Sequence, residues 1–379
     1  MSKLRSRTSI SGLFFLHGLV FSSWAVRIPA IQEMHGLTEA TLGTVLLCKP
    51  VASLLCMPVA AKAVEKFGSK KVLLFAISTY GVLLYGIGLM PSVAFLMLNL
   101  FLFSFASNLV NISINTQAIA LEKLYGKSVM GSLHGLWSMA GFVGGALGAL
   151  MIAEKIPPAT HFLIITGLAF AGAYAASPHL LPDEEKVHEE KKKFFRIPEG
   201  PLVLLGVIAF FSLLCEGTMF DWSGIYFKKV VGAEGGWIGA GYTAFMITMA
   251  GTRFLSDILR DRIGPKKILL FSGLLIFMGL MLAVLFPVLP VALLGFLLVG
   301  SGVSSIIPLV YGLTGKTKVM SPSAAVTAVA TTGYFGFLLG PPLIGWIASA
   351  SSLRISFTLI SFMGLMIIAL SRKLSTIEQ

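Results

Sequence analysis

Charged side chains are scarce in this sequence, and their scarcity excludes a soluble protein. Only 12% of the 379 residues are Asp, Glu, Lys or Arg, while 56% are hydrophobic. An average soluble domain is about 25% charged. A soluble chain of this length would form two or three domains with charged surfaces, and too few charged side chains are present to cover them. The composition therefore predicts an integral membrane protein.

Cysteines are few, and catalytic motifs are lacking. The three cysteines, Cys48, Cys56 and Cys215, fall in apolar segments without C-x-x-C spacing, so we expect neither a disulfide nor a metal site. The sequence contains no H-E-x-x-H motif, no nucleophile elbow and no G-x-x-x-x-G-K-[ST] loop. We therefore predict that the chain is neither an enzyme nor an ATP-driven pump, and that it uses no cofactor or metal.

Long runs without any charged residue predict the membrane crossings. A helix crosses a hydrocarbon core of about 30 Å in about 20 residues. The runs 72–121 and 268–315 are long enough for two crossings each, with Pro91 and Pro287 near their middles. Eight further crossings are predicted at 8–26, 39–62, 128–153, 156–182, 201–228, 235–252, 319–353 and 355–371. The sum is twelve, all α-helical, because lipid leaves no backbone group unpaired.

Lysine and arginine are distributed unevenly over the segments between these crossings. With the N-terminus in the cytoplasm, 23 basic residues fall on cytoplasmic segments and five on outer ones, namely Arg27, Lys155, Lys228, Lys229 and Arg354. The positive-inside rule then predicts that both termini are cytoplasmic, and we expect the cell inner membrane. The net charge of +12 is interpreted as a topology signal with affinity for anionic membrane lipid. No nucleic-acid partner is expected, and we expect a monomer.

The chain contains an internal repeat. Residues 65–75 align with 261–271 at an offset of 196, and at the same offset Gly144 meets Gly340. With a slip of two, Trp24 meets Trp222. Three matches in order indicate duplication, so we predict two pseudo-symmetric six-helix halves, 1–182 and 200–379, joined by a polar cytoplasmic linker, 183–199. Transporters built this way bind solute near the midplane between the repeats. Glycines at 141, 144, 145, 148, 336, 340 and 345 predict close helix packing at the seam between the halves.

The segment 65–71, echoed at 261–267, resembles the loop motif of the major facilitator superfamily, with an acid, a basic residue, Gly and two further basic residues. Ala61 stands where that motif begins with Gly, and Glu65 replaces its usual Asp. The strings 24–31, 134–138, 216–223 and 336–345 are similar to the MosC- and YbjJ-like subgroup. The resemblance covers the whole chain and implies a twelve-helix transporter for a sugar- or cyclitol-like solute.

Two carboxylates lie inside a predicted crossing. Glu216 and Asp221 interrupt the apolar segment 201–228, where charge is usually kept for ion pathways or substrate contact. Five residues correspond to about 140° of helix rotation, so we expect the two side chains on different faces. We predict proton coupling at these residues, chiefly at Glu216, which lies nearer the midplane. Asp221 would alternatively pair with Arg27, and a purely structural polar contact is the alternative for both.

Polar and aromatic side chains at helical spacing predict solute contacts. Asn108, Asn111 and Asn115 form one stripe, whose amides suit a hydroxylated solute and equally suit helix–helix contacts. Lys49, deep in a crossing, would bind an acidic group of the solute or pair with an acid. Indole rings could stack on a sugar ring. The predicted solute-binding residues are His17, Trp24, Lys49, Asn108, Asn111, Asn115, His134, Trp137, Trp222, Tyr311 and Tyr334.

A cytoplasmic gate is predicted at the loop motif and its echo. Gly68 and Gly264 permit tight turns, and Arg253 and Asp257 lie four apart on one helical face, where they can pair. The lysines of the motif are interpreted as membrane anchors and its acids as parts of a latch, because acids near a membrane need partners. The predicted gate residues are Glu65, Lys66, Gly68, Arg253, Asp257, Asp261, Arg262 and Gly264.

These features together predict a proton-coupled secondary active transporter that moves a small polar solute by alternating access. Two alternatives stay open at this point. One is an efflux carrier of the same fold for drugs or metabolites. The other is a solute sensor with a transporter-like fold that binds but does not transport.

Overall fold

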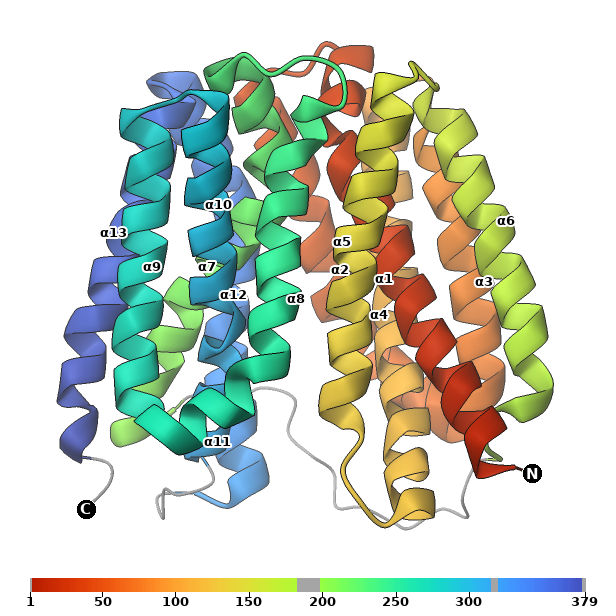
Figure 1. Ribbon diagram of the computed structural model, residues 1–379. Coiled ribbons are helices and arrows are strands. Elements are labelled where there is room, and N and C mark those ends of the chain that lie inside the picture. The colour runs from red at the N-terminus through yellow and green to blue at the C-terminus, as the bar shows by residue number, and fades with distance from the viewer. Residues whose placement is uncertain (1, 183–197, 315–319, 377–379) are drawn as a thin grey trace. The chain divides into compact units, whose positions relative to one another are not determined.

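The computed structural model describes residues 2–182, 198–314 and 320–376, apart from the side chains of 256–258, 261, 322, 323, 375 and 376. Regular structure in these residues is helical throughout (Figure 1), which confirms the all-α prediction. The predicted linker 183–199 lies almost entirely outside the described residues. The helices before it are α1 (Lys3–Met34), α2 (Glu39–Phe67), α3 (Ser69–Ile87), α4 (Val93–Tyr125), α5 (Met130–Ala153), α6 (Pro158–Ala176) and the short η1 (Ser177–His179).

The helices after the linker repeat the same plan with one break. They are α7 (Pro201–Tyr226), η2 (Phe227–Val231), α8 (Trp237–Ile263), α9 (Pro265–Leu285), α10 (Leu289–Ser304), α11 (Ile306–Thr314), α12 (Pro322–Ala350), α13 (Leu353–Arg372) and η3 (Lys373–Thr376). At the offset of 196, Ser69 at the start of α3 corresponds to Pro265 at the start of α9, and Val93 at the start of α4 to Leu289 at the start of α10. The backbone therefore carries the repeat that the sequence predicts.

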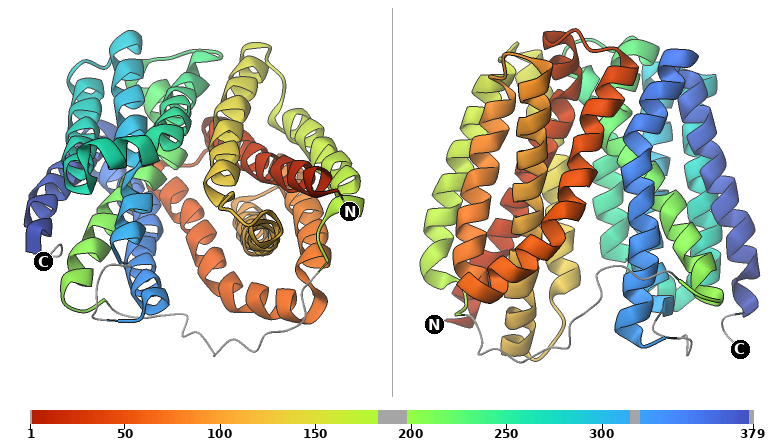
Figure 2. Two further views of the ribbon diagram at one scale, coloured as in Figure 1. Left: turned by 60° about the horizontal axis from the view of Figure 1, so that its bottom comes forward. Right: turned by 180° about the vertical axis from the view of Figure 1, so that it is seen from behind.

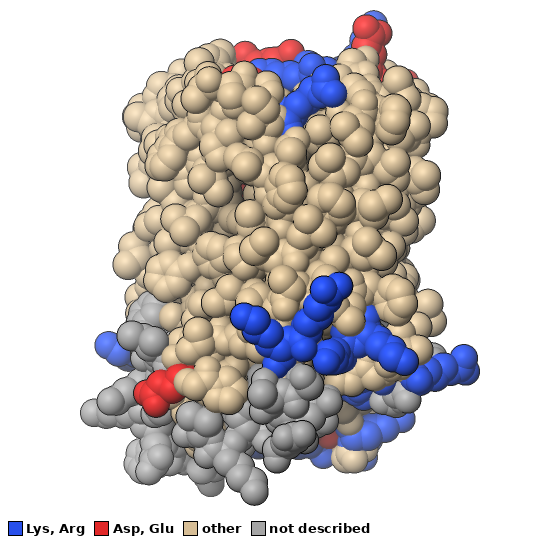
Figure 3. Space-filling model, turned by 90° about the vertical axis from the view of Figure 1, so that its left-hand side faces the viewer, with Lys and Arg blue, Asp and Glu red and all other residues tan. Residues whose placement is uncertain are grey.

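Eleven helical segments of the described chain are long and apolar enough to cross a membrane, with α10 and α11 forming one crossing together. The twelfth predicted crossing is α8, which has 27 residues and carries charges only in its second half, from Arg253 onward. One face of the molecule shows a broad band without charged side chains, and Lys and Arg gather toward one end (Figure 3). The structure is that of a multi-pass membrane protein.

Contacts divide the chain into two units, Met1–Gly36 with Val45–Glu190, and Leu37–Thr44 with Lys191–Gln379. In the first unit α1 packs on α5 and α6, and α3 packs on α4 and α6. In the second unit the corresponding pairs are α7 with α12 and α13, and α9 with α10 and α13. Both views in Figure 2 show these helices running alongside one another within each unit. The first residues of α2 thus belong to the second unit.

Glycines allow close helix packing, but in a different place from the predicted seam. A Cβ on Gly144 or Gly148 of α5 would overlap side chains of α1, and a Cβ on Gly336 of α12 would overlap the Phe210 carbonyl of α7. These contacts lie within each half, so the seam prediction is wrong for these three glycines. Gly345 of α12 packs against Gly43 of α2 inside the second unit.

The fourth crossing of each half differs. α4 is continuous over 33 residues, whereas its counterpart is split into α10 and α11 at Ser305 (Figure 1). Pro308 explains the break, because proline has no N–H to donate to the carbonyl of Ser304, four residues before it. Tyr311 therefore lies on a short inner helix of its own, and the fold places this helix beside α7.

Candidate solute and coupling site

The second half contains a buried ion pair between α7 and α8. Arg253 Nη2 donates to Glu216 Oε1 at 3.4 Å, with 7% of the Glu216 side chain and 21% of the Arg253 side chain exposed. The charge of Glu216 also acts on the phenol of Tyr311, on the short helix α11. Three predicted residues therefore come together here, two of them from the predicted solute and coupling set and one from the predicted gate.

α7 places this carboxylate because nearly its whole C-terminal half is enclosed. Every residue from Leu214 to Tyr226 is buried, so polar groups on this stretch must find partners inside the protein. Gly217, next to Glu216, lets α7 lie close to the ring of Phe337 of α12. The isolated charge in an apolar helix is thus held in a packed, water-poor environment, as the position of Glu216 in the sequence predicts.

Other predicted residues of the second half lie apart from this pair along the helices. Asp221 and Trp222 are 4% and 0% exposed, respectively, and Trp222 has no hydrogen-bond partner for Nε1 among the described residues. Tyr334 of α12 is half-buried. The pairing of Asp221 with Arg27 stays a prediction. The bonds described for Arg27 are to His161 and to the Ile156 carbonyl.

In the first half, the predicted aromatic residues form a cluster around α1. His17 lies 5.6 Å from Tyr80 and 6.3 Å from Trp137, measured between ring centroids, and its Nε2 is 3.0 Å from Ser107 Oγ. Trp24 contacts Phe103 at a centroid distance of 6.4 Å. His134 lies against Phe14 at 5.4 Å. α1, α3, α4 and α5 all contribute, so residues distant in the sequence line one region of this half.

Lys49 and the asparagine stripe lie on α2 and α4. Lys49 Nζ is 5.9 Å from the ring centroid of Trp24, a cation–π distance. Asn108 Nδ2 donates to the Ser53 carbonyl of α2 at 3.1 Å, which supports its helix-binding alternative. Asn115 Nδ2 donates to Asn111 Oδ1 at 3.0 Å, as expected from one stripe. Asn111 is exposed and Asn115 half-buried.

The predicted gate residues are only partly described. Gly68 and Gly264 have φ of 85° and 80° at the starts of α3 and α9, a conformation that favours glycine. Glu65, Lys66 and Arg262 are exposed. The side chains of Asp257 and Asp261 lie outside the described residues, so their part in a latch stays a prediction.

Several polar contacts carry no signal that sequence reasoning could use. Gln117 of α4, 1% exposed, binds both backbone groups of Leu181 and donates to Ser69 Oγ at 2.8 Å. Glu122 Oε1 accepts from Ser128 Oγ and from the N–H groups of Val129 and Met130 at the start of α5. A lone Gln or Glu near a helix end looks like a solvated residue, and its partners become visible only in the fold.

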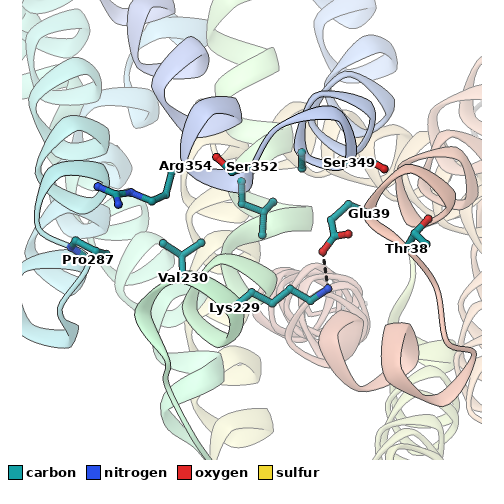
Figure 4. A pocket seen from close by; sticks show the side chains of 10 residues that line it. Thr38, Glu39, Lys229, Val230, Pro287, Ser349, Ser352 and Arg354 are labelled. Carbon is teal, nitrogen blue, oxygen red and sulfur yellow. Dashed lines mark hydrogen bonds and ion pairs between the residues drawn. The ribbon is translucent and has the colours of Figure 1, made fainter.

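The second unit also has a surface pocket of about 490 Å³ (Figure 4). Lys229 of η2 donates to Glu39 of α2 across it, with 41% and 23% of the side chains exposed. Exposed ion pairs of this kind are worth at most about 1 kcal/mol. Its lining residues are Thr38, Glu39, Lys229, Val230, Pro287, Ala348, Ser349, Ser352, Leu353 and Arg354. They include none of the predicted solute-binding residues, so we do not place the solute here.

Comparisons with known proteins agree with this arrangement. The chain is 32% identical to an uncharacterized MFS-type transporter of Yersinia pestis, over 95% of this chain and 93% of that one. It is 28% identical to the membrane protein MosC of Rhizobium meliloti, over 95% and 88%.

Solved structures with the same fold include a bacterial homolog of the human lysosomal transporter Spinster, in an inward-facing and occupied conformation. Its TM-score is 0.76 at 14% identity, covering 99% of this chain and 98% of that one. The nucleoside transporter NupG has a TM-score of 0.75 at 11% identity, covering 99% and 100%. Residues 10–334 match the family model of the Major Facilitator Superfamily. The chain therefore belongs to this superfamily and is a membrane transporter, not an enzyme.

Proposed function

We propose that the chain is a proton-coupled secondary transporter that moves a small hydroxylated solute, sugar- or cyclitol-like, across the inner membrane by alternating access. Both termini face the cytoplasm in this proposal, as the basic-residue asymmetry favours. Glu216 carries the coupling proton, and Arg253 is the cation that holds the carboxylate when the proton has left.

The observation that carries the proposal is the enclosed Glu216–Arg253 pair. A carboxylate that is 6% exposed has few ways to stabilise its charge, and a single guanidinium contact at 3.4 Å is longer than a strong charge-assisted hydrogen bond. Both protonation states are therefore accessible without rebuilding the helix. An alternating-access carrier needs such a group, which takes a proton on one side and yields it on the other.

Polarity around α1 supports a hydroxylated solute. His17, Trp24 and Trp137 offer ring faces, and Asn111 offers an exposed amide. Rings bind the apolar faces of a sugar or cyclitol, while amides exchange hydrogen bonds with its hydroxyl groups. Replacing Trp24, Asn111 or Trp137 by Ala should weaken solute binding more than it lowers the unfolding temperature.

The test begins with a thermal-shift screen of the purified protein against sugars, cyclitols, amino sugars and efflux drugs, because ligands that bind the folded state raise its unfolding temperature. The best solute then enters proteoliposome assays. Glu216→Gln keeps size and hydrogen bonding and mimics the protonated carboxyl. We expect this variant to retain binding and counterflow exchange but to lose accumulation driven by a pH gradient.

Asp221→Asn is the matched control, since it neutralises the other buried acid of α7. We expect it to lower folding yield or exchange rate while accumulation driven by the pH gradient persists. If Glu216→Gln still concentrates solute under a pH gradient, Glu216 is not the coupling group. If efflux drugs alone shift the unfolding temperature, the solute class is wrong while the transporter assignment stands.

A further inference from the structure

Arg27 is a buried cation whose described partners are both neutral. It is 3% exposed, and its Nε donates to His161 Nδ1 at 3.1 Å while its Nη2 donates to the Ile156 carbonyl at 2.9 Å. A guanidinium has five N–H groups, so these bonds use two of them. Buried charges are normally paired with an opposite charge. Arg253 in the second half follows that rule through Glu216, and Arg27 does not among the described residues.

His161 adds a second donor to this place. Since its Nδ1 accepts from Arg27, the neutral ring carries its proton on Nε2. The residue is 0% exposed, and Nε2 has no hydrogen-bond partner in the described structure. A buried polar group left in this way costs about 1–3 kcal/mol and calls for an explanation. Arg27 and His161 together present only donors and one net positive charge.

The fold does not require this arrangement. At the offset of 196, His161 corresponds to Phe357, and with the slip of two, Ile28 next to Arg27 corresponds to Tyr226. In the second half these positions form an apolar contact, a Tyr226–Phe357 stack with centroids 4.2 Å apart. The first half holds the same helix pair, α1 with α6, with a charged guanidinium and an imidazole. That substitution points to a purpose beyond packing.

The neighbouring backbone prepares the space. Gly148 of α5 lacks the Cβ that would lie 3.3 Å from His161 Cε1 and would also overlap Val26. Lys155 adopts φ of 56° and turns the chain so that the Ile156 carbonyl meets Arg27. The cation is thus held between α1, α6 and the turn before α6, near the predicted outer end of the first half.

We propose that Arg27 and His161 form a binding site for a small monovalent anion, either a halide or a carboxylate. The anion supplies the negative charge that Arg27 lacks and accepts from its remaining N–H groups, with His161 Nε2–H as a further donor. The anion is a free ion or the acidic group of a solute, and both share this chemistry. The inference does not depend on the coupling role of Glu216.

Thermal unfolding of the full-length protein tests the site. Sodium chloride, sodium acetate and sodium gluconate are titrated at constant ionic strength against a bulky sulfonate, which is too large to enter. We expect a saturable rise in unfolding temperature with chloride or acetate in the wild-type protein, because these ions bind the folded state. Gluconate, a hydroxylated carboxylate, separates the two sources, since a solute site would bind it more tightly than acetate.

Three variants locate the effect. Arg27→Gln should abolish the anion-dependent shift. Arg27→Lys keeps the charge and folds with the same net charge, so it should retain a weaker, saturable shift. His161→Phe introduces the residue of the second half and should raise the half-saturating concentration about tenfold, as expected for loss of one hydrogen bond to a charged group.

Two results would overturn the proposal. One is an equal shift in the wild-type protein and in both Arg27→Gln and Arg27→Lys, which would place the anion elsewhere. The other is no anion effect together with a destabilisation by Asp221→Asn that disappears when Arg27 is Gln. Asp221 would then be the counter-charge of Arg27, as the alternative from the sequence has it.

Discussion

Glu216 and Arg253 of the second half correspond in the repeat to Gly18 and Met57 of the first. The backbones of the two halves follow one plan, with the same helix pairs in contact. The ion pair is therefore not a property of the shared fold but an addition to one copy of it. Where the second half holds a carboxylate, the first half brings α1 so close to α5 that a Cβ on Gly18 would lie 2.5 Å from the Trp137 carbonyl.

The fourth crossing shows the same division of labour. Gln117 on the continuous α4 corresponds to Leu313 on α11, and Ile112 corresponds to Pro308. Gln117 fixes the chain leaving the first half to α3 and α4 by three hydrogen bonds, whereas α11 is separated from α10. We infer that the first half is built as a rigid frame with a ring-lined surface, and the second half as the copy that carries the charge and the hinge.

Removing the cation of the buried pair should have the largest effect. Arg253→Gln leaves Glu216, 6% exposed, without its positive partner, and should lower the free energy of unfolding by about 3–5 kcal/mol if the carboxylate stays ionised. Chemical denaturation in detergent measures this change. The double variant Arg253→Gln with Glu216→Gln removes both charges and should recover most of the loss. A double variant as unstable as the single one would show that the pair is not what stabilises α7 against α8.

Gln117→Leu should have the next largest effect, because it gives the first half the residue of the second. The backbone N–H and C=O of Leu181 would both lose their described partner, at about 1–2 kcal/mol for each group. Hydrogen exchange of residues 177–182 should accelerate along with the loss of stability. Asn99→Leu is the control, since Asn99 joins α4 to α3 through the Leu83 carbonyl at 2.8 Å without touching this segment. Unchanged exchange at 177–182 would exclude the clamp.

Gly18→Ala tests the close packing that replaces the ion pair in the first half. The new methyl group would overlap backbone atoms of α5 and should cost about 1–3 kcal/mol, as overpacking does. Gly340→Ala is matched, because α12 meets α7 there with ordinary spacing, 3.5 Å from Leu214 Cδ1. That control should be neutral or slightly stabilising, since Ala favours a helix. Equal melting temperatures for the two variants would contradict the difference between the halves.

The fold was predictable because lipid imposes simple rules. Charge-free runs of sufficient length mark helices, and the duplicated loop motif marks the halves. Glu216 was predictable because one carboxylate in an apolar helix stands out. Its partner was not, because spacing suggests pairs only along one helix. Arg253 was assigned to Asp257 four residues away, whereas its described contact is 37 positions away on α7.

The residues that were missed share one property. His161 and Gln117 each sit alone in apolar sequence, and nothing nearby announces a partner. His161 meets Arg27 across 134 positions, and Gln117 meets Leu181 across 64. Such contacts follow from the tertiary fold, which brings helices together at a register that no local pattern encodes. The asparagine stripe shows the reverse case, since the spacing of Asn111 and Asn115 was enough to predict their contact.

The break between α10 and α11 should respond to the smallest change. Pro308→Ala restores an N–H that can donate to the Ser304 carbonyl, as the Ile112 N–H can in the continuous α4. One added hydrogen bond is worth about 1 kcal/mol, so amide exchange over residues 304–310 should slow about fivefold with little change in melting temperature. Pro287→Ala, in the turn between α9 and α10, should leave that exchange unaffected. Because Tyr311 rides on α11, a stiffened hinge should also slow solute exchange while binding persists. Slower amide exchange at unchanged solute exchange would leave Pro308 a packing feature and remove the hinge from the second half.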